Sequence, residues 1–126
     1  VIDLMHKVRA PYPIARPAVA AATAELAKLS PGVLGERVVA VSAERDRLTA
    51  KLRQLKSVVK VYPSEANFIL MRVKSATDVM QRAAARGIIL RDRSRELGLA
   101  DCVRISIGTR SENDALLEAL QTEVPL

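Results

Sequence analysis

The sequence is poor in the residues that most often perform catalysis or bind metals. Its 126 residues include a single cysteine, Cys102, and a single histidine, His6. A lone cysteine excludes an internal disulfide and a cysteine-rich metal site, and a lone histidine excludes a pair of histidines on one metal ion. Cys102 lies among β-forming residues, so we expect a small buried side chain rather than a nucleophile. The residues therefore predict no catalytic group and no metal site within this chain.

Aromatic residues and long apolar runs are also scarce. Two tyrosines, one phenylalanine and no tryptophan are present, so few rings are available to stack on nucleic-acid bases. The formal net charge is +6, but basic and acidic residues are interspersed, which is typical of solvated helix faces and predicts no nucleic-acid partner. No apolar run approaches the ~20 residues of a membrane-spanning helix, and no signal peptide is visible. We expect no membrane partner and a reducing, cytoplasmic location.

The chain does contain enough aliphatic side chains for a core, since 49% of its residues are hydrophobic. Its length suits a single domain, residues 1–126. The first residues, Val-Ile-Asp-Leu, lack a starting methionine, which suggests that the chain was cut from a longer protein.

Periodicity and turn signals predict an alternation of helices and strands. The predicted helices cover 1–9, 17–29 and 35–56, then a stretch between Ser75 and Gly87 and a stretch that begins at Thr109. The predicted strands cover 58–62, 67–73, 88–91 and 102–107, and we expect strand 67–73 to be central and buried on both faces. Short connections favour antiparallel pairing. We predict an α+β fold, with a small, largely antiparallel sheet and helices packed on one face.

Two predicted strands each carry one arginine, Arg91 and Arg104. Because successive side chains of a strand point to opposite faces, Arg104 should project from one face while Val103 and Ile105 pack into the core on the other. A guanidinium held on a strand suits a carboxylate or a phosphate, since its fork matches two oxygens at once. The alternative is an internal salt bridge. Two arginines on neighbouring strands favour an anion site.

Four segments occur in order along the chain: Ala-Pro-Tyr-Pro at 10–13, Ser-Glu-Ala-Asn-Phe at 64–68, Gly-Ile-Ile-Leu-Arg-Asp at 87–92 and Val-Arg-Ile-Ser-Ile-Gly-Thr-Arg at 103–110. Together they resemble the C-terminal part of the histidinol-phosphate aminotransferase family, which belongs to the fold-type I enzymes that depend on pyridoxal phosphate. The last two segments are specific when they occur together. The resemblance covers essentially the whole chain, in the right order and at the right spacings.

The resemblance implies a domain organisation and an activity for a parent protein. Residues 1–16 would be the end of an interdomain helix and a proline-rich connector, and residues 17–126 the C-terminal small domain. The parent would be a homodimer that binds pyridoxal 5'-phosphate in a large domain of the same chain. In histidine biosynthesis it would convert histidinol phosphate and 2-oxoglutarate to imidazole acetol phosphate and glutamate.

The resemblance also implies roles for individual residues. Arg104 matches the arginine that binds the acidic end of the substrate, and Arg91 matches a second arginine of the substrate-phosphate site. Asn67 lines the same cleft, or makes an ordinary hydrogen bond at the end of a strand. The family's Schiff-base lysine should lie upstream of residue 1. We therefore expect the isolated chain to have no transaminase activity and to bind no pyridoxal phosphate tightly.

The roles of two residues and two alternatives for the whole chain stay open. Tyr12 contacts a ligand or packs in the connector, and Arg16 departs from the family pattern, in which a small polar residue is expected. The chain is alternatively a stand-alone regulatory module that binds a small anion. It is also compatible with a fragment of a related enzyme, such as a decarboxylase of threonine phosphate or an aminotransferase of aromatic amino acids.

Overall fold

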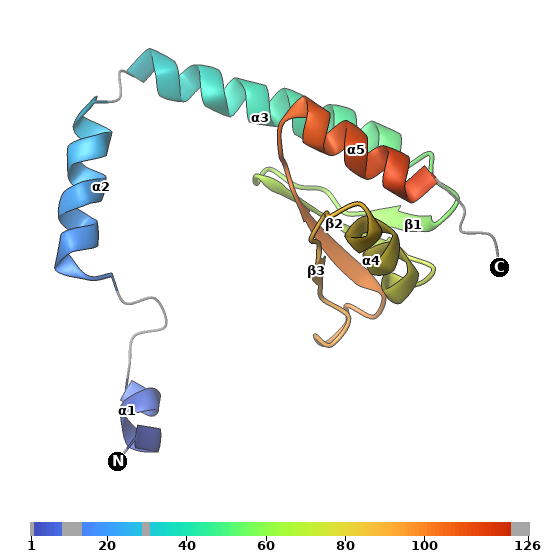
Figure 1. Cartoon of the computed structure of the whole chain (residues 1–126), viewed down its shortest axis with the longest axis horizontal. Helices are drawn as coiled ribbons and strands as arrows, with labels where there is room; N and C mark the ends of the chain where they lie inside the picture. The colour runs from blue at the N-terminus through green and yellow to red at the C-terminus, as the bar shows by residue number, and fades with distance from the viewer. Residues whose placement is uncertain (1, 9–13, 29–30, 122–126) are drawn as a thin grey trace. The chain divides into compact units, whose positions relative to one another are not determined.

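A computed structural model describes residues 2–8, 14–28 and 31–121 (Figure 1). The chain divides into two compact units, residues 1–36 and 37–126. The division at residues 16 and 17 that the resemblance implies stays a prediction.

The first unit contains only helices among its described residues. They are α1 (Ile2–Val8), α2 (Arg16–Lys28) and the start of α3 (Pro31–Leu52). No residue of α2 is buried. Helix α3 begins earlier than predicted, because Pro31 is tolerated in a first turn, where a backbone N–H has no intrahelical partner. It also ends earlier, because the N–H groups of Gln54 and Leu55 bond three residues back and tighten the chain into turns.

The second unit is built on a four-stranded sheet with the order β1-β2-β4-β3. The strands are β1 (Val58–Val61), β2 (Phe68–Val73), β3 (Arg91–Asp92) and β4 (Cys102–Ser106). Every neighbouring pair is antiparallel, so the predicted α+β fold is confirmed. Strand β3 is shorter than predicted. The backbone N–H of Ile88 donates to the carbonyl of Ala83 in the last turn of the preceding helix, Ala76–Ala85 (2.9 Å), and so does not pair with a neighbouring strand.

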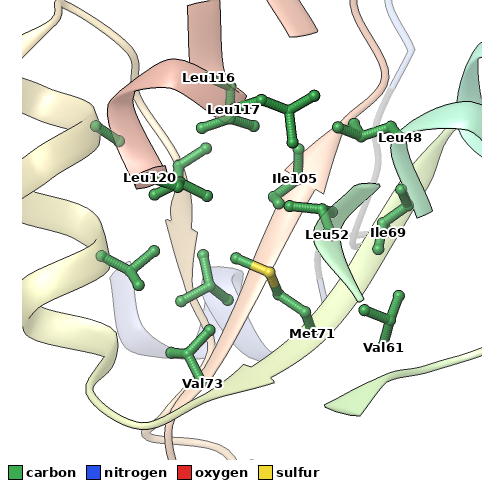
Figure 2. Packing of buried hydrophobic residues seen from close by; sticks show 14 of the residues in the cluster. Leu48, Leu52, Val61, Ile69, Met71, Val73, Ile105, Leu116, Leu117 and Leu120 are labelled. Atoms are coloured by element: carbon green, nitrogen blue, oxygen red, sulfur yellow. The ribbon is translucent and has the colours of Figure 1, made fainter. Parts of the chain in front are cut away.

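Helices α3, α4 (Ala76–Ala85) and α5 (Arg110–Gln121) supply apolar side chains to one core, which also contains the inward residues of β2 and β4 (Figure 2). Burial alternates along β2: Ile69, Met71 and Val73 are buried, whereas the intervening side chains are only half-buried. The prediction that this strand is buried on both faces is therefore wrong. Its other face is not covered by the helices of the core, and we call this side of the sheet the open face.

Capping residues hold the ends of α4 and the start of α5. The Ser75 hydroxyl accepts the Asp78 N–H at the start of α4 (3.2 Å). Gly87 follows the end of α4 with φ +72°, a conformation that glycine adopts without strain. At the start of α5, Thr109 and Glu112 bond reciprocally, each accepting the backbone N–H of the other. Both helices are thus held at defined points of the sheet.

Candidate functional site

The two predicted anion-binding arginines lie directly opposite each other. Arg91 of β3 and Arg104 of β4 are cross-strand partners in the antiparallel register. Opposed residues of an antiparallel pair place their Cβ atoms roughly 5 Å apart on the same face. Arg104 is half-buried and Arg91 is exposed. Because Val103 and Ile105 are buried in the core, both arginines belong to the open face.

Within the described part of the chain, neither arginine forms an ion pair with a carboxylate. Other arginines do: Arg47 contacts Glu44 and Asp114, and Arg93 contacts Glu96. The internal salt bridge considered as an alternative is therefore not found for this pair among these residues. Two like charges directly opposite each other destabilise a sheet. A bound anion would relieve that repulsion.

Arg104 is held by an aromatic ring. Its guanidinium carbon lies 5.3 Å from the centre of the Phe68 ring, within the usual range of a cation–π contact. Its Nε is buried and has no hydrogen-bond partner in the structure. A buried donor left unpaired costs about 1–3 kcal/mol. The geometry therefore presents an oriented cation whose Nε–H has no hydrogen-bond partner.

Asn67, the third predicted site residue, is not next to this pair. Its backbone carbonyl accepts the N–H of Ile107 (2.8 Å), and its side chain is exposed. The β2–β4 register places Leu70 opposite Arg104. Asn67 is three residues from Leu70, or roughly 10 Å along a strand. The observed backbone bond agrees with the strand-end alternative, and a contact of the side chain with ligand stays a prediction.

The sequence singled out two further residues, Tyr12 and Arg16. Tyr12 is outside the described residues. Arg16 is the first residue of α2, and its side chain is exposed.

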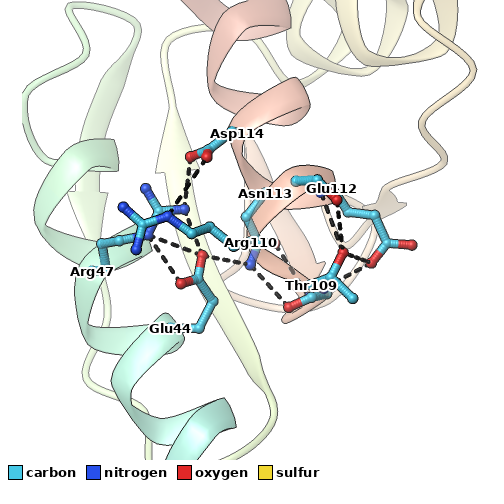
Figure 3. Close-up of polar contacts among 9 residues, drawn as sticks. Glu44, Arg47, Thr109, Arg110, Glu112, Asn113 and Asp114 are labelled. Carbon is cyan, nitrogen blue, oxygen red and sulfur yellow. Dashed lines mark hydrogen bonds and ion pairs between the residues drawn. The ribbon is translucent and has the colours of Figure 1, made fainter.

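A buried polar network holds the turn between β4 and α5 (Figure 3). Asn113 is 3% exposed. Its side-chain amide donates to the Gly108 carbonyl and to the Glu44 carboxylate (3.1 Å each) and accepts the Gly108 N–H (3.2 Å). Arg47 bridges Glu44 (2.5 Å) and Asp114 (2.7 Å). The turn that follows the strand of Arg104 is thereby tied to α3.

Hydrogen bonding in and around this network lowers two carboxyl pKa values. The pKa of Glu44 lies below its ordinary value chiefly because Arg47 donates to it, with a further hydrogen bond from Asn113. Burial opposes this shift. The pKa of Glu112 is lowered by hydrogen bonds from the backbone N–H and the hydroxyl of Thr109. Both groups are therefore expected to be ionised at neutral pH.

Sequence reasoning did not identify Phe68 or the network around Asn113 as parts of this region. Phe68 was part of a predicted strand and of the motif at 64–68, but neither gave its side chain a role, and its contact with Arg104 depends on the register of β2 and β4. Asn113 follows the cap residue Glu112. Asn113 stands at helical spacing from the buried Leu116 and Leu120. A polar residue on the apolar side of this helix was the signal in the sequence that could have indicated a buried hydrogen-bond network.

None of the lysines among the described residues lies in the apolar setting that activates a Schiff-base lysine. A Schiff-base site needs a desolvated lysine whose pKa is depressed. The lysines of this chain are all exposed: Lys7, Lys28, Lys51, Lys56, Lys60 and Lys74. In the part of the chain that is described, no group of three or more potential metal ligands lies together, and no helix is long and apolar enough to cross a membrane.

Comparisons with known proteins agree with the motifs. The model of the family "Aminotransferase class I and II" matches residues 1–120. The histidinol-phosphate aminotransferase of Escherichia coli O7:K1 (strain IAI39 / ExPEC) is 40% identical over 123 residues, which are 98% of this chain and 35% of the relative. The chain thus spans about a third of the length of the curated relatives it matches.

Solved structures give the same relationship. The histidinol-phosphate aminotransferase of Sinorhizobium meliloti, in complex with pyridoxal-5'-phosphate, superposes with a TM-score of 0.66 at 27% identity, over 94% of this chain and 32% of that one. The enzyme from Clostridium acetobutylicum superposes with a TM-score of 0.65 at 27% identity, over 69% of this chain and 27% of that one. The resemblance read from the four motifs is confirmed, and the chain belongs to the class I and II aminotransferase family.

Proposed function

We propose that this chain is the C-terminal small domain of a longer aminotransferase, which transfers an amino group from histidinol phosphate to 2-oxoglutarate. The parent would bind pyridoxal phosphate in a large domain, form a homodimer and supply the reacting groups from outside this chain. Residues 1–16 would connect the two domains. The 40% identity to a histidinol-phosphate aminotransferase over nearly the whole chain supports this assignment.

Within that enzyme, Arg91 and Arg104 would bind the anionic groups of the substrates. The observation that carries this proposal is the pair of arginines at opposed positions of β3 and β4 on the open face, with no ion-paired carboxylate among the described residues. Arginine binds phosphate and carboxylate through two parallel N–H···O bonds. The same pair could therefore accept the phosphate monoester of one substrate and a carboxylate of the other in successive half-reactions.

The test is steady-state kinetics of the longer enzyme carrying Arg104→Ala or Arg91→Ala. A hydrogen bond to a charged group contributes about 1.5–3 kcal/mol, and 1.36 kcal/mol corresponds to a tenfold change. Each substitution should therefore lower kcat/KM for histidinol phosphate by roughly tenfold to a hundredfold. Arg104→Lys should recover only part of the loss, because an ammonium cannot make the bidentate contact.

Arg86→Ala is the matched control. It removes the same charge from an exposed arginine of the C-terminal unit, whose guanidinium is 4.0 Å from Glu118, and it should leave kcat/KM unchanged. Equal losses in Arg86→Ala and Arg104→Ala would show that only net charge matters. Full activity of Arg104→Ala would refute the proposed binding role.

The isolated chain offers a second test. With every lysine exposed, it should form no Schiff base that survives dilution. Pyridoxal phosphate added to the 126-residue chain should give no stable shift of the cofactor's absorption and no transamination. Transaminase activity of the isolated chain would contradict the assignment of the reacting groups to another domain.

A decarboxylase of a phosphate-ester amino acid is the second candidate. It is favoured by the likeness to the L-threonine-O-3-phosphate decarboxylase of Porphyromonas gingivalis, which superposes with a TM-score of 0.58 at 26% identity over 64% of this chain. Both substrates carry a phosphate monoester, which the proposed arginine pair would bind. Release of carbon dioxide from threonine phosphate, without formation of glutamate from 2-oxoglutarate, would select the decarboxylase.

A further inference from the structure

We propose that Phe68 is the positioning residue for Arg104, and that its ring holds the guanidinium in the direction from which an anion binds. This inference rests on the proposed role of the arginine pair. The inference adds Phe68, an uncharged residue of β2, to the arginine pair of β3 and β4.

The strand register brings the two side chains together. Phe68 lies opposite Ser106, and Leu70 lies opposite Arg104. Phe68 and Arg104 are therefore diagonal neighbours on the same face, a spacing that aromatic and long side chains bridge. The guanidinium carbon is 5.3 Å from the ring centre. The ring thus contacts the cation from the β2 side.

Arg91 approaches the same side chain from the opposite side, because β4 lies between β2 and β3. Arg104 therefore has an attractive ring on one flank and a like charge on the other. Both interactions favour an orientation of the guanidinium over the ring.

The ring orients Arg104 without using its donors. Arg47 and Arg93 are held by carboxylates, which occupy their N–H groups and offset their charge. The π-face of Phe68 holds the guanidinium through its quadrupole, so the charge is not offset. The buried Nε of Arg104 has no hydrogen-bond partner in the structure. An arginine held in this way is oriented and still able to bind a ligand oxygen.

The composition gives a second reason. Phe68 is the only phenylalanine of the chain, and it is half-buried on the open face rather than part of the aliphatic core. Packing in the core does not account for the ring at this position. Its contact with Arg104 does.

The experiment compares the 126-residue chain with Phe68→Leu and Phe68→Tyr, using inorganic phosphate as the probe. The ¹H–¹⁵N spectrum of the arginine Nε–Hε groups reports on the ring contact before any ligand is added. The Arg104 Hε resonance, assigned by its loss in Arg104→Lys, should be displaced by the ring current in the wild type and in Phe68→Tyr. It should return to the ordinary arginine position in Phe68→Leu.

Phosphate titration gives the functional readout. Phe68→Leu should weaken phosphate binding by roughly twofold to tenfold, the range expected from loss of a partly exposed cation–π contact. Phe68→Tyr should bind like the wild type. Leu55→Ala removes a half-buried apolar side chain that packs against the core. It should lower the melting temperature and leave both the resonance and the phosphate affinity unchanged.

The outcomes separate this inference from the proposed function. An undisplaced Arg104 resonance in the wild type, or unchanged phosphate affinity in Phe68→Leu, would overturn the positioning role of Phe68. A displaced resonance that depends on Phe68, in a chain that binds no phosphate, would support the contact and count against the arginine pair as an anion site.

Discussion

Substitution of Asn113 by alanine should lower the free energy of unfolding by about 3 kcal/mol. The side chain is 3% exposed and makes three hydrogen bonds. Two of them join neutral groups, at about 1 kcal/mol each, and the third ends on the Glu44 carboxylate, at about 1.5–3 kcal/mol. Two effects make the loss smaller than this sum. Water can enter the vacated space and bond to the freed groups, and Glu44 keeps its ion pair with Arg47, so we expect about 3 kcal/mol.

The assay is urea unfolding followed by circular dichroism, with the free energy extrapolated to water. A loss of about 3 kcal/mol corresponds to a fall in melting temperature on the order of 10–20 °C for a domain of this size. Gln121→Ala, at an exposed position of the same helix, controls for helix propensity and should change stability by less than about 0.5 kcal/mol.

A loss below about 1 kcal/mol in Asn113→Ala would refute the reasoning. It would mean that the three hydrogen bonds are replaced by water at no net cost, so that the network does not hold the turn after β4. A large loss accompanied by a changed denaturant dependence would instead indicate an altered unfolded or native state, and the two-state free energy would then not apply.

Two further predictions concern pH and backbone conformation. The folded pKa of Glu44 lies below its ordinary value of 4.5, so its contribution to stability is present above about pH 4.5 and is lost as the pH falls through the folded pKa. Glu44→Gln should therefore show a smaller loss of stability between pH 7 and pH 3 than the wild type in parallel urea titrations, and equal losses would contradict this. Gly87→Ala places a Cβ at φ +72° with no atom within 4 Å, so strain without a clash should cost about 1–2 kcal/mol. Thermal unfolding measures this loss of stability. Ala84→Gly, at an exposed position of the preceding helix, gives for comparison the loss of stability that a glycine causes inside the helix.

The local sequence determined the caps of α4 and α5 and the class of fold. Ser75, Gly87 and the Thr109–Glu112 pair act on backbone groups within a few residues of themselves, so their effect can be read from neighbours along the chain. The alternation around Arg104 likewise predicted which side chains enter the core. The four motifs carried the family resemblance, because motif order and spacing are properties of the sequence itself.

Only the tertiary structure decided which distant residues meet. The pairing of Arg91 with Arg104 and the contact of Phe68 with Arg104 depend on strand register, and a shift of one residue would turn each side chain to the other face. Strand β3 is short because the chain after α4 still bonds to that helix. One face of β2 is only half-buried because the helices of the core cover the other face. The bond from Asn113 to Glu44 joins residues 69 positions apart. Contacts of this kind form between segments whose order in the chain says nothing about their distance in space.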